Sequence, residues 1–428
     1  MLISPRRLAM PCLLTAIGLL WSSTSVSGQQ GEAEDSDSWD VTLARGETVD
    51  VDFTTDEGTW MSVDGSPDGQ WIAFDLLGHI YRIFSDGGDA ELLTRDAGVS
   101  VNYHPRYSPD GRTIAFISDR GGQNNLWVMD SDGSNPRSVF SSNTFRAVEP
   151  EWTPDGQYIV IRRSRVSGTG DGNGLYMYHR DGGEGIELVS SADESSAAWP
   201  SISTDGRHLF FHMYAGPGIV GRDVLAGSWQ IRRKDLRTGE VISITAGRAA
   251  QQVRGSSGSG YAPEVSPDGR WLAFARRIPN GTISFKGHRF GPRTALWLRD
   301  LETGAERIIM DPITQDAAEG MKTLRIVPAY SWTADGSAMI ISQGGKIKRL
   351  DIDSGNVSTI PFQARVQRTA SEQSRANFRI TDDPFMARFL RWPSAAPNGQ
   401  TVAFQAIGRI WLQSLPDGEP RALTADGF

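Results

Sequence analysis

The chain has 428 residues, a net charge of −8 and a hydrophobic content of 39%. This length exceeds that of one ordinary domain but suits a repeat array, and the acidic balance argues against nucleic acid as a partner. Cys12 is the single cysteine, which excludes internal disulfides.

The first 28 residues have the pattern of a secretory signal peptide. Arg6 and Arg7 precede a mostly apolar run from Leu8 to Trp21, and small residues end the segment. This run of about 14 residues contains Pro11 and is shorter than the ~20 residues that span a bilayer. We therefore expect a periplasmic or secreted protein that keeps no stable membrane span after signal cleavage.

A tetrapeptide of the Ser-Pro-Asp-Gly type recurs seven times after an acidic linker at 29–47. Its third position is the repeat anchor: Asp68, Asp110, Asp155, Asp205, Asp268, Asp335 and Asn398. Six residues after each anchor stands a large apolar residue: Phe74, Phe116, Ile161, Phe211, Phe274, Ile341 and Phe404. The first two spacings, 42 and 45 residues, are near the ~40–45 of a propeller blade.

Each unit is predicted to form four short strands joined by hairpins. In the second copy, Pro109–Gly111 is a turn, and strands are expected at Thr113–Ser118, Leu126–Met129 and Arg137–Phe140. The strand after the turn is apolar on both faces, which indicates sheets stacked on both sides of it.

The sequence therefore predicts an all-β fold, a β-propeller of seven four-stranded antiparallel blades over residues 48–428. Val49, Val51 and Phe53 alternate with acidic residues, so 48–53 is expected to form an added strand that pairs beside the last sheet. A β-solenoid is the alternative, although its rungs are usually shorter.

No catalytic, cofactor-binding or metal-binding residue is predicted. The chain contains neither His-x-His nor Gly-x-Ser-x-Gly, so the signatures of an amidohydrolase metal site and a serine hydrolase are missing. His208 and His212 share a face of one predicted strand, and we expect a structural role for both. Asp130 and Asp351 begin fragments that resemble calcium loops but have the composition of turns.

One insertion, Gln363–Arg391, is locally basic on an acidic protein. It carries six arginines that form a candidate docking surface: Arg365, Arg368, Arg375, Arg379, Arg388 and Arg391. The alternative is an ordinary solvated loop, although loops carry function more often than strands do.

The motif S-P-D-G-R-x-[IL]-A-F, followed by D-x-x-G and L-W-V-M-D-x-D-G, resembles the propeller repeat of TolB, the periplasmic Tol–Pal component. The resemblance covers nearly all of 54–428 and recurs seven times. TolB also has a small α/β domain before a six-bladed propeller, which residues 29–53 are too few to supply.

A closer resemblance is to the N-terminal propeller of large exported proteins that end in an amidohydrolase barrel. It is carried by Glu57–Asp64, Phe74–Tyr81, Asp382–Asp383 with Leu390–Trp392, and Phe404–Arg409. In that family a divalent metal lies in the C-terminal barrel, which begins with His-x-His and is absent from this sequence. The resemblance therefore implies no cofactor and no catalysis in this chain, and a parent protein that is a metal-dependent amidohydrolase.

We thus expect an exported, non-catalytic module that binds protein or peptide on a propeller face, or that gates an attached C-terminal hydrolase domain. The alternatives are a complete periplasmic TolB-type interaction protein and the gating propeller of a serine peptidase.

Overall fold

The computed structural model describes residues 40–167, 173–194, 196–214, 229–245, 260–278, 283–285, 288–290, 293–314, 327–371 and 383–424. All regular elements within these ranges are β-strands, so the all-β prediction is confirmed. In the same ranges no helix is long and apolar enough to cross a membrane. The chain divides into two compact units, Met1–Glu372 and Gln373–Phe428.

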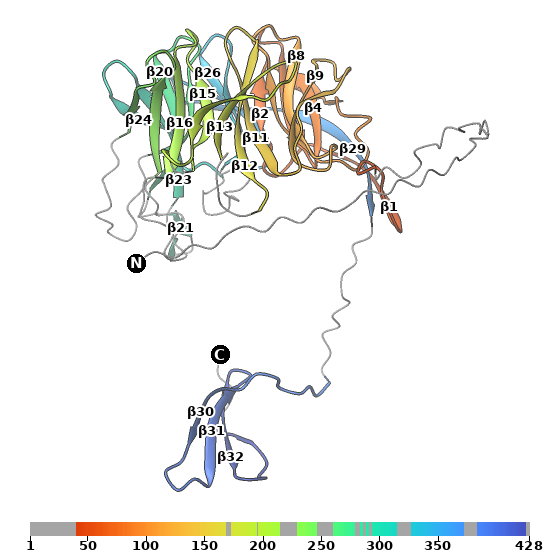
Figure 1. Ribbon diagram of the computed structural model, residues 1–428, viewed down its shortest axis with the longest axis vertical. Helices are drawn as coiled ribbons and strands as arrows, with labels where there is room; N and C mark the ends of the chain where they lie inside the picture. Colours follow the sequence, from red (N-terminus) through yellow and green to blue (C-terminus); the bar gives the residue numbers. More distant parts are fainter. Residues whose placement is uncertain are drawn as a thin grey trace, which may run out of the picture. The chain divides into compact units, whose positions relative to one another are not determined.

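Seven four-stranded antiparallel sheets form around the seven anchors in the described part of the chain, as predicted (Figure 1). We number the six sheets of the first unit blades 1 to 6. Blades 1 to 3 consist of β2 (Val63–Gly65), β3 (Trp71–Leu76), β4 (His79–Phe84) and β6 (Glu91–Leu92); β7 (Asn102–Tyr107), β8 (Thr113–Ser118), β9 (Asn125–Asp130) and β10 (Arg137–Phe140); and β11 (Phe145–Trp152), β12 (Tyr158–Arg165), β13 (Gly174–His179) and β14 (Ile186–Ser190).

Blades 4 to 6 repeat the same order. They consist of β15 (Ala198–Ile202), β16 (His208–Tyr214), β17 (Trp229–Asp235) and β18 (Val241–Ser243); β19 (Tyr261–Val265), β20 (Trp271–Ile278), β23 (Arg293–Asp300) and β24 (Glu306–Met310); and β25 (Ser331–Trp332), β26 (Ala338–Gln343), β27 (Lys346–Asp351) and β28 (Val357–Ile360). The strands β21 (Ile283–Phe285) and β22 (His288–Phe290) form a separate ribbon between β20 and β23. The second unit contains the seventh sheet, made of β30 (Arg391–Ala395), β31 (Thr401–Ala406), β32 (Arg409–Ser414) and β33 (Arg421–Ala422).

The six blades of the first unit close into a ring. Each blade packs against the next, and β2 of blade 1 contacts β25 and β26 of blade 6. At this junction Val63 N–H donates to Ala329 O (3.1 Å). One buried apolar cluster there contains Phe74 from blade 1 and Ile340 from blade 6. The first and last blades of the unit are therefore direct neighbours.

The anchor aspartates hold the tight turn that begins each second strand. In blade 1, Ser66 Oγ donates to Asp68 Oδ1 (2.5 Å), and Gln70 N–H donates to the same oxygen (3.0 Å). The serine hydroxyl in turn accepts from Trp71 N–H (2.9 Å). A Ser or Thr repeats these contacts with the anchor in blades 2 to 6. The predicted turns thus owe their shape to Asx-type hydrogen bonds.

The apolar residue six positions after each anchor fills the space between neighbouring sheets. Phe116 is fully buried and packs with Ile80 and Leu93 of blade 1. Phe274 is fully buried and packs with Phe210 and Ile231 of blade 4. The stacking of sheets on both sides of the second strand is confirmed.

The strand predicted over 48–53 is present, but the prediction of its partner is wrong. β1 (Thr48–Thr55) pairs antiparallel with β29 (Phe362–Ser371) and not with the last sheet. β29 also pairs in parallel with β5 (Gly88–Asp89) beside blade 1, and the two long strands are neighbours in Figure 1. Packing selects this partner, because Phe362, Ala364 and Val366 of β29 are buried in the cluster between blades 6 and 1.

We predict that Phe116→Ala and Phe274→Ala each destabilise the protein by roughly 3–5 kcal/mol, because each empties a fully buried aromatic site. Phe84→Ala is the control, since Phe84 is 53% exposed, and should cost less than about 1 kcal/mol. Denaturant titration measures all three. Losses below about 1 kcal/mol for both buried phenylalanines would contradict the packing described.

Candidate functional site

A β-bulge recurs in the first strand of several sheets, six residues before the anchor. At each bulge a non-glycine residue has a positive φ, between 49° and 58°: His104, Glu149, Trp199, Ala262 and Trp392. The ladder shifts register at these points, for example between Tyr103 and Arg106. Such backbone persists only where its surroundings hold it in place.

The bulges in the first unit are held by side chains from the preceding blade. His104 N–H donates to Asp75 Oδ2 (2.8 Å), and Glu149 N–H donates to His104 Nδ1 (3.3 Å). Trp199 N–H donates to Glu149 Oε2 (2.8 Å). Ala262 N–H donates to His212 Nδ1 (3.2 Å). Four successive junctions between blades are thus fixed by one buried polar side chain each.

Four residues before each anchor, the first strand of every blade carries a polar side chain. The six residues are Asp64, Arg106, Glu151, Ser201, Glu264 and Ser331. Arg106 of blade 2 forms an ion pair with Glu264 of blade 5, which is on the opposite side of the six-membered ring. Because this contact crosses the ring, we call the six residues the axial cluster.

Arg106 is the centre of the axial cluster. Its Nη1 donates to Asp64 Oδ1 (3.1 Å), and its Nε lies 3.5 Å from Glu151 Oε2. Glu264 also accepts from Trp199 Nε1 (3.0 Å). One guanidinium, only 11% exposed, therefore links four of the six blades.

Three carboxyl groups surround this single positive charge. Burial raises the pKa of Glu151 to about 8 against the opposing charge of Arg106. Burial likewise raises the pKa of Asp64 and of Glu264. Burial therefore opposes the ionised form of all three carboxyls, and the guanidinium already supplies a positive charge among them.

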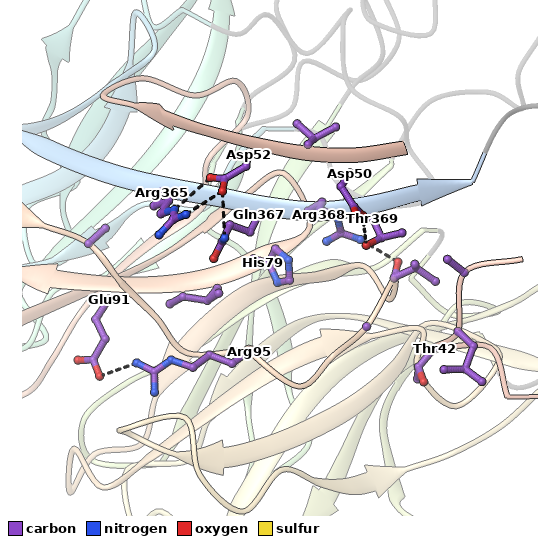
Figure 2. A pocket seen from close by; sticks show the side chains of 17 residues that line it. Thr42, Asp50, Asp52, His79, Glu91, Arg95, Arg365, Gln367, Arg368 and Thr369 are labelled. Carbon is purple, nitrogen blue, oxygen red and sulfur yellow. Dashed lines mark hydrogen bonds and ion pairs between the residues drawn. The ribbon is translucent and has the colours of Figure 1, made fainter. Parts of the chain in front are cut away.

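A cavity of about 950 Å³ lies between blade 1, the β1–β29 pair and the segment around Thr42 (Figure 2). Arg365 forms a bidentate pair with Asp52, with distances of 3.0 and 2.7 Å. Thr369 Oγ1 donates to Asp50 Oδ1 (2.7 Å). On the facing wall, Glu91 binds Arg95 (3.2 Å).

His79 and Arg368 lie deeper in this cavity. Arg368 Nη2 donates to Val99 O (2.8 Å) and Ser100 O (3.2 Å), so this side chain fastens β29 to the segment that joins blades 1 and 2. Burial and the neighbouring Arg368 charge lower the pKa of His79 to about 4. His79 is therefore neutral at physiological pH, and its Nδ1 lies 3.1 Å from Thr94 Oγ1.

The structure separates the six arginines of the candidate docking insertion. Arg365 and Arg368 belong to a strand, β29, rather than to a solvated loop. Arg375 and Arg379 lie outside the described residues, whereas Arg388 and Arg391 belong to the second unit. A docking role for the set stays a prediction.

The calcium-like fragments are turns, as predicted. Ser134 N–H donates to Asp132 Oδ1 (2.9 Å), and Ser354 N–H donates to Asp351 Oδ1 (2.8 Å). Across the ranges that the structure describes, no group of three His, Cys, Asp or Glu residues is arranged to hold a metal ion.

Comparison with known proteins identifies the fold family. The TolB beta propeller domain family matches residues 48–234. The uncharacterized protein Atu1656 of Agrobacterium fabrum is 31% identical over 244 residues, which are 54% of this chain and 74% of that protein. The chain belongs to the TolB-like β-propeller family. The resemblance to TolB repeats read from the sequence is thereby confirmed, whereas the amidohydrolase link is not.

Two further matches are to proteins that extend beyond the matched region. The uncharacterized peptidase YuxL of Bacillus subtilis is 29% identical over 188 residues, 43% of this chain but only 23% of the peptidase. The solved structure of TolB from Acinetobacter baumannii is 17% identical with a TM-score of 0.49, covering 71% of this chain and 65% of that one.

We predict that the free energy of unfolding of Glu151→Gln, measured relative to that of the wild-type protein, increases as pH rises. The folded pKa of Glu151, about 8, lies above its ordinary value of 4.5, so native wild-type protein keeps a proton that the unfolded chain has lost. Wild-type protein is therefore destabilised relative to the glutamine variant as pH rises from about 4.5 to about 8.

Urea titrations at several pH values measure this difference. Glu184→Gln, which changes an exposed glutamate, is the control variant. A difference between Glu151→Gln and wild type that stays constant from pH 5 to about pH 9 would mean that Glu151 is already ionised in the native state.

Proposed function

We propose that this chain is an exported, non-catalytic propeller module that binds an extended protein or peptide segment. In this proposal the module is the N-terminal part of a larger hydrolase. The observation that carries the binding role is the cavity beside the β1–β29 pair. Its volume of about 950 Å³ is at the upper end of ligand sites and suits a peptide better than a small metabolite.

The strand β1 offers a way to bind such a segment. Among the strands that the structure describes, it is an edge strand of its sheet and pairs only with β29, over eight residues. An edge strand presents a row of backbone donors and acceptors to which an added strand can pair. Val49, Val51 and Phe53 of β1 are 38% to 61% exposed, so an added strand would also bury apolar surface.

The charges around the cavity favour a peptide of low net charge. The three arginines that line it, Arg95, Arg365 and Arg368, are matched by the three acidic residues Asp50, Asp52 and Glu91. Two of the arginines already pair with these acids. Backbone pairing, rather than charge attraction, therefore supplies the affinity in this proposal.

The non-catalytic part of the proposal rests on the residues themselves. The sequence has neither His-x-His nor Gly-x-Ser-x-Gly. The three axial carboxyls surround a guanidinium, which already occupies the place of a cation. The export part rests on the pattern of the first 28 residues.

Two kinds of parent protein fit this module. The match to the Bacillus peptidase favours the propeller of a peptidase, since that protein extends far beyond the matched residues. An amidohydrolase parent rests on the sequence resemblance alone. A complete TolB-type interaction protein is the remaining alternative.

One experiment tests binding and catalysis together. Purified protein is incubated with a library of uncharged 12-residue peptides, with and without Zn²⁺ or Mn²⁺. We expect selected peptides to slow amide hydrogen exchange in β1 and to be recovered intact. Simple amide, lactam and dipeptide substrates should likewise show no turnover above background.

The control is exchange in β8, which is buried on both faces and should not respond to peptide. Metal-dependent cleavage that tracks with the pure protein would overturn the non-catalytic role. Failure of every peptide to protect β1 would overturn the proposed binding mode.

A further inference from the structure

The two faces of the strand β1 differ in chemistry, because successive side chains of a strand point to opposite faces. Val49, Val51 and Phe53 share one face. Phe53 pairs with Val366 of β29, which is buried in the cluster between blades 6 and 1. The three side chains on β1 are themselves exposed. The apolar face of the β1–β29 pair therefore continues outward onto β1 as an exposed surface.

The opposite face of β1 carries two acids, Asp50 and Asp52, which differ in their partners. The bidentate pair with Arg365 compensates the charge of Asp52, and Gln367 Nε2 donates to the same carboxylate (3.1 Å) (Figure 2). Asp50 is exposed and accepts from the hydroxyl of Thr369, a neutral donor. Among the described residues, no Lys or Arg forms an ion pair with Asp50.

The nearby guanidinium of Arg368 does not supply the missing charge. Arg368 pairs with Val51 across the ladder and so belongs to the apolar face. Its two terminal nitrogens donate to three backbone carbonyls within the segment 77–100. The polar face of β1 thus presents the negative charge of Asp50 to solvent, while the apolar face presents three side chains. These are two separate criteria that a strand added to β1 has to meet.

A second copy of this chain meets the charge criterion poorly. Antiparallel pairing of two β1 strands centred on Val51 places Asp50 of each copy directly opposite Asp52 of the other. Like charges at directly opposite positions destabilise a sheet. A segment of another protein that carries a basic residue at this position has no such penalty, and its charge complements that of Asp50.

We propose that β1 binds an extended segment in which apolar and polar residues alternate, with one Lys or Arg among the polar residues, opposite Asp50. The apolar residues of the segment lie beside the exposed apolar side chains of β1. Its other polar residues are uncharged, since Arg365 already compensates Asp52. This inference rests on the function proposed above and adds the chemistry of the partner. Backbone pairing still supplies the affinity, whereas the pattern selects among segments.

Three capped nine-residue peptides test this pattern by titration calorimetry with the purified protein, and hydrogen exchange shows whether they bind at β1. The first, T-V-T-V-K-V-T-V-T, alternates with Lys on the polar face. The second, V-V-V-V-K-T-T-T-T, has the same composition in blocks. The third is the alternating peptide with Gln in place of Lys.

We expect the alternating peptide to bind at least about fivefold more tightly than the block peptide, since only alternation places all its valines on one face. The Lys peptide should bind about two- to fivefold more tightly than the Gln peptide, which is the effect of one exposed pair of opposite charges across strands.

The matched variants are Asp50→Asn and Asp353→Asn. The first keeps an acceptor for the hydroxyl of Thr369 but removes the charge, so the Lys and Gln peptides should bind it equally while the preference for alternation remains. The second removes an exposed carboxylate from the turn between β27 and β28, and should keep the preference for Lys. In the wild-type protein, which needs no variant to fold, about 0.5 M NaCl should reduce that preference, because salt screens exposed charges.

The outcomes separate this inference from the function on which it rests. Protection of β1 by all three peptides with equal affinity would overturn the inference and leave the proposed binding mode standing. Protection by none of them would count against the binding mode itself. A preference for Lys that persists in Asp50→Asn or is insensitive to salt would overturn the role of Asp50. A dimer in light scattering whose β1 amides are protected without peptide would place a second copy on this edge and overturn the proposal.

Discussion

The buried guanidinium of Arg106 is the interaction on which the ring depends. It binds Asp64 of blade 1, Glu151 of blade 3 and Glu264 of blade 5 from its own place in blade 2. The sheets of the ring pack against their neighbours, whereas this contact crosses the axis and fixes the relative positions of blades 2 and 5, which share no sheet interface.

Buried polar side chains also join neighbouring blades at the bulges of the first strands. Each of the four bulges in the first unit turns a backbone N–H toward a side chain of the preceding blade, and the positive φ of residues such as Glu149 and Trp199 is the cost of that contact. Buried polar groups therefore concentrate around the axis.

Much of this fold is predictable from the sequence because the repeat is local. The anchor turns depend on residues within five positions of each other, and the burial of Phe116 and Phe274 follows from the repeat period of the second strand.

The sequence analysis did not find the axial cluster, although a signal existed: a polar residue stands four positions before each of the first six anchors. The partner of β1 and the cavity beside it were not predictable, because β29 is chosen by packing over more than 300 residues of separation.

The most direct measurement is the unfolding free energy of Arg106→Met in denaturant, beside Arg112→Met at an exposed position. Removing one partner of a buried ion pair typically costs about 3–5 kcal/mol, and we expect a loss of that size for Arg106→Met. Arg112→Met should change stability by no more than about 0.5 kcal/mol. Equal, small effects of the two substitutions would contradict the claim that a contact across the axis holds the ring together.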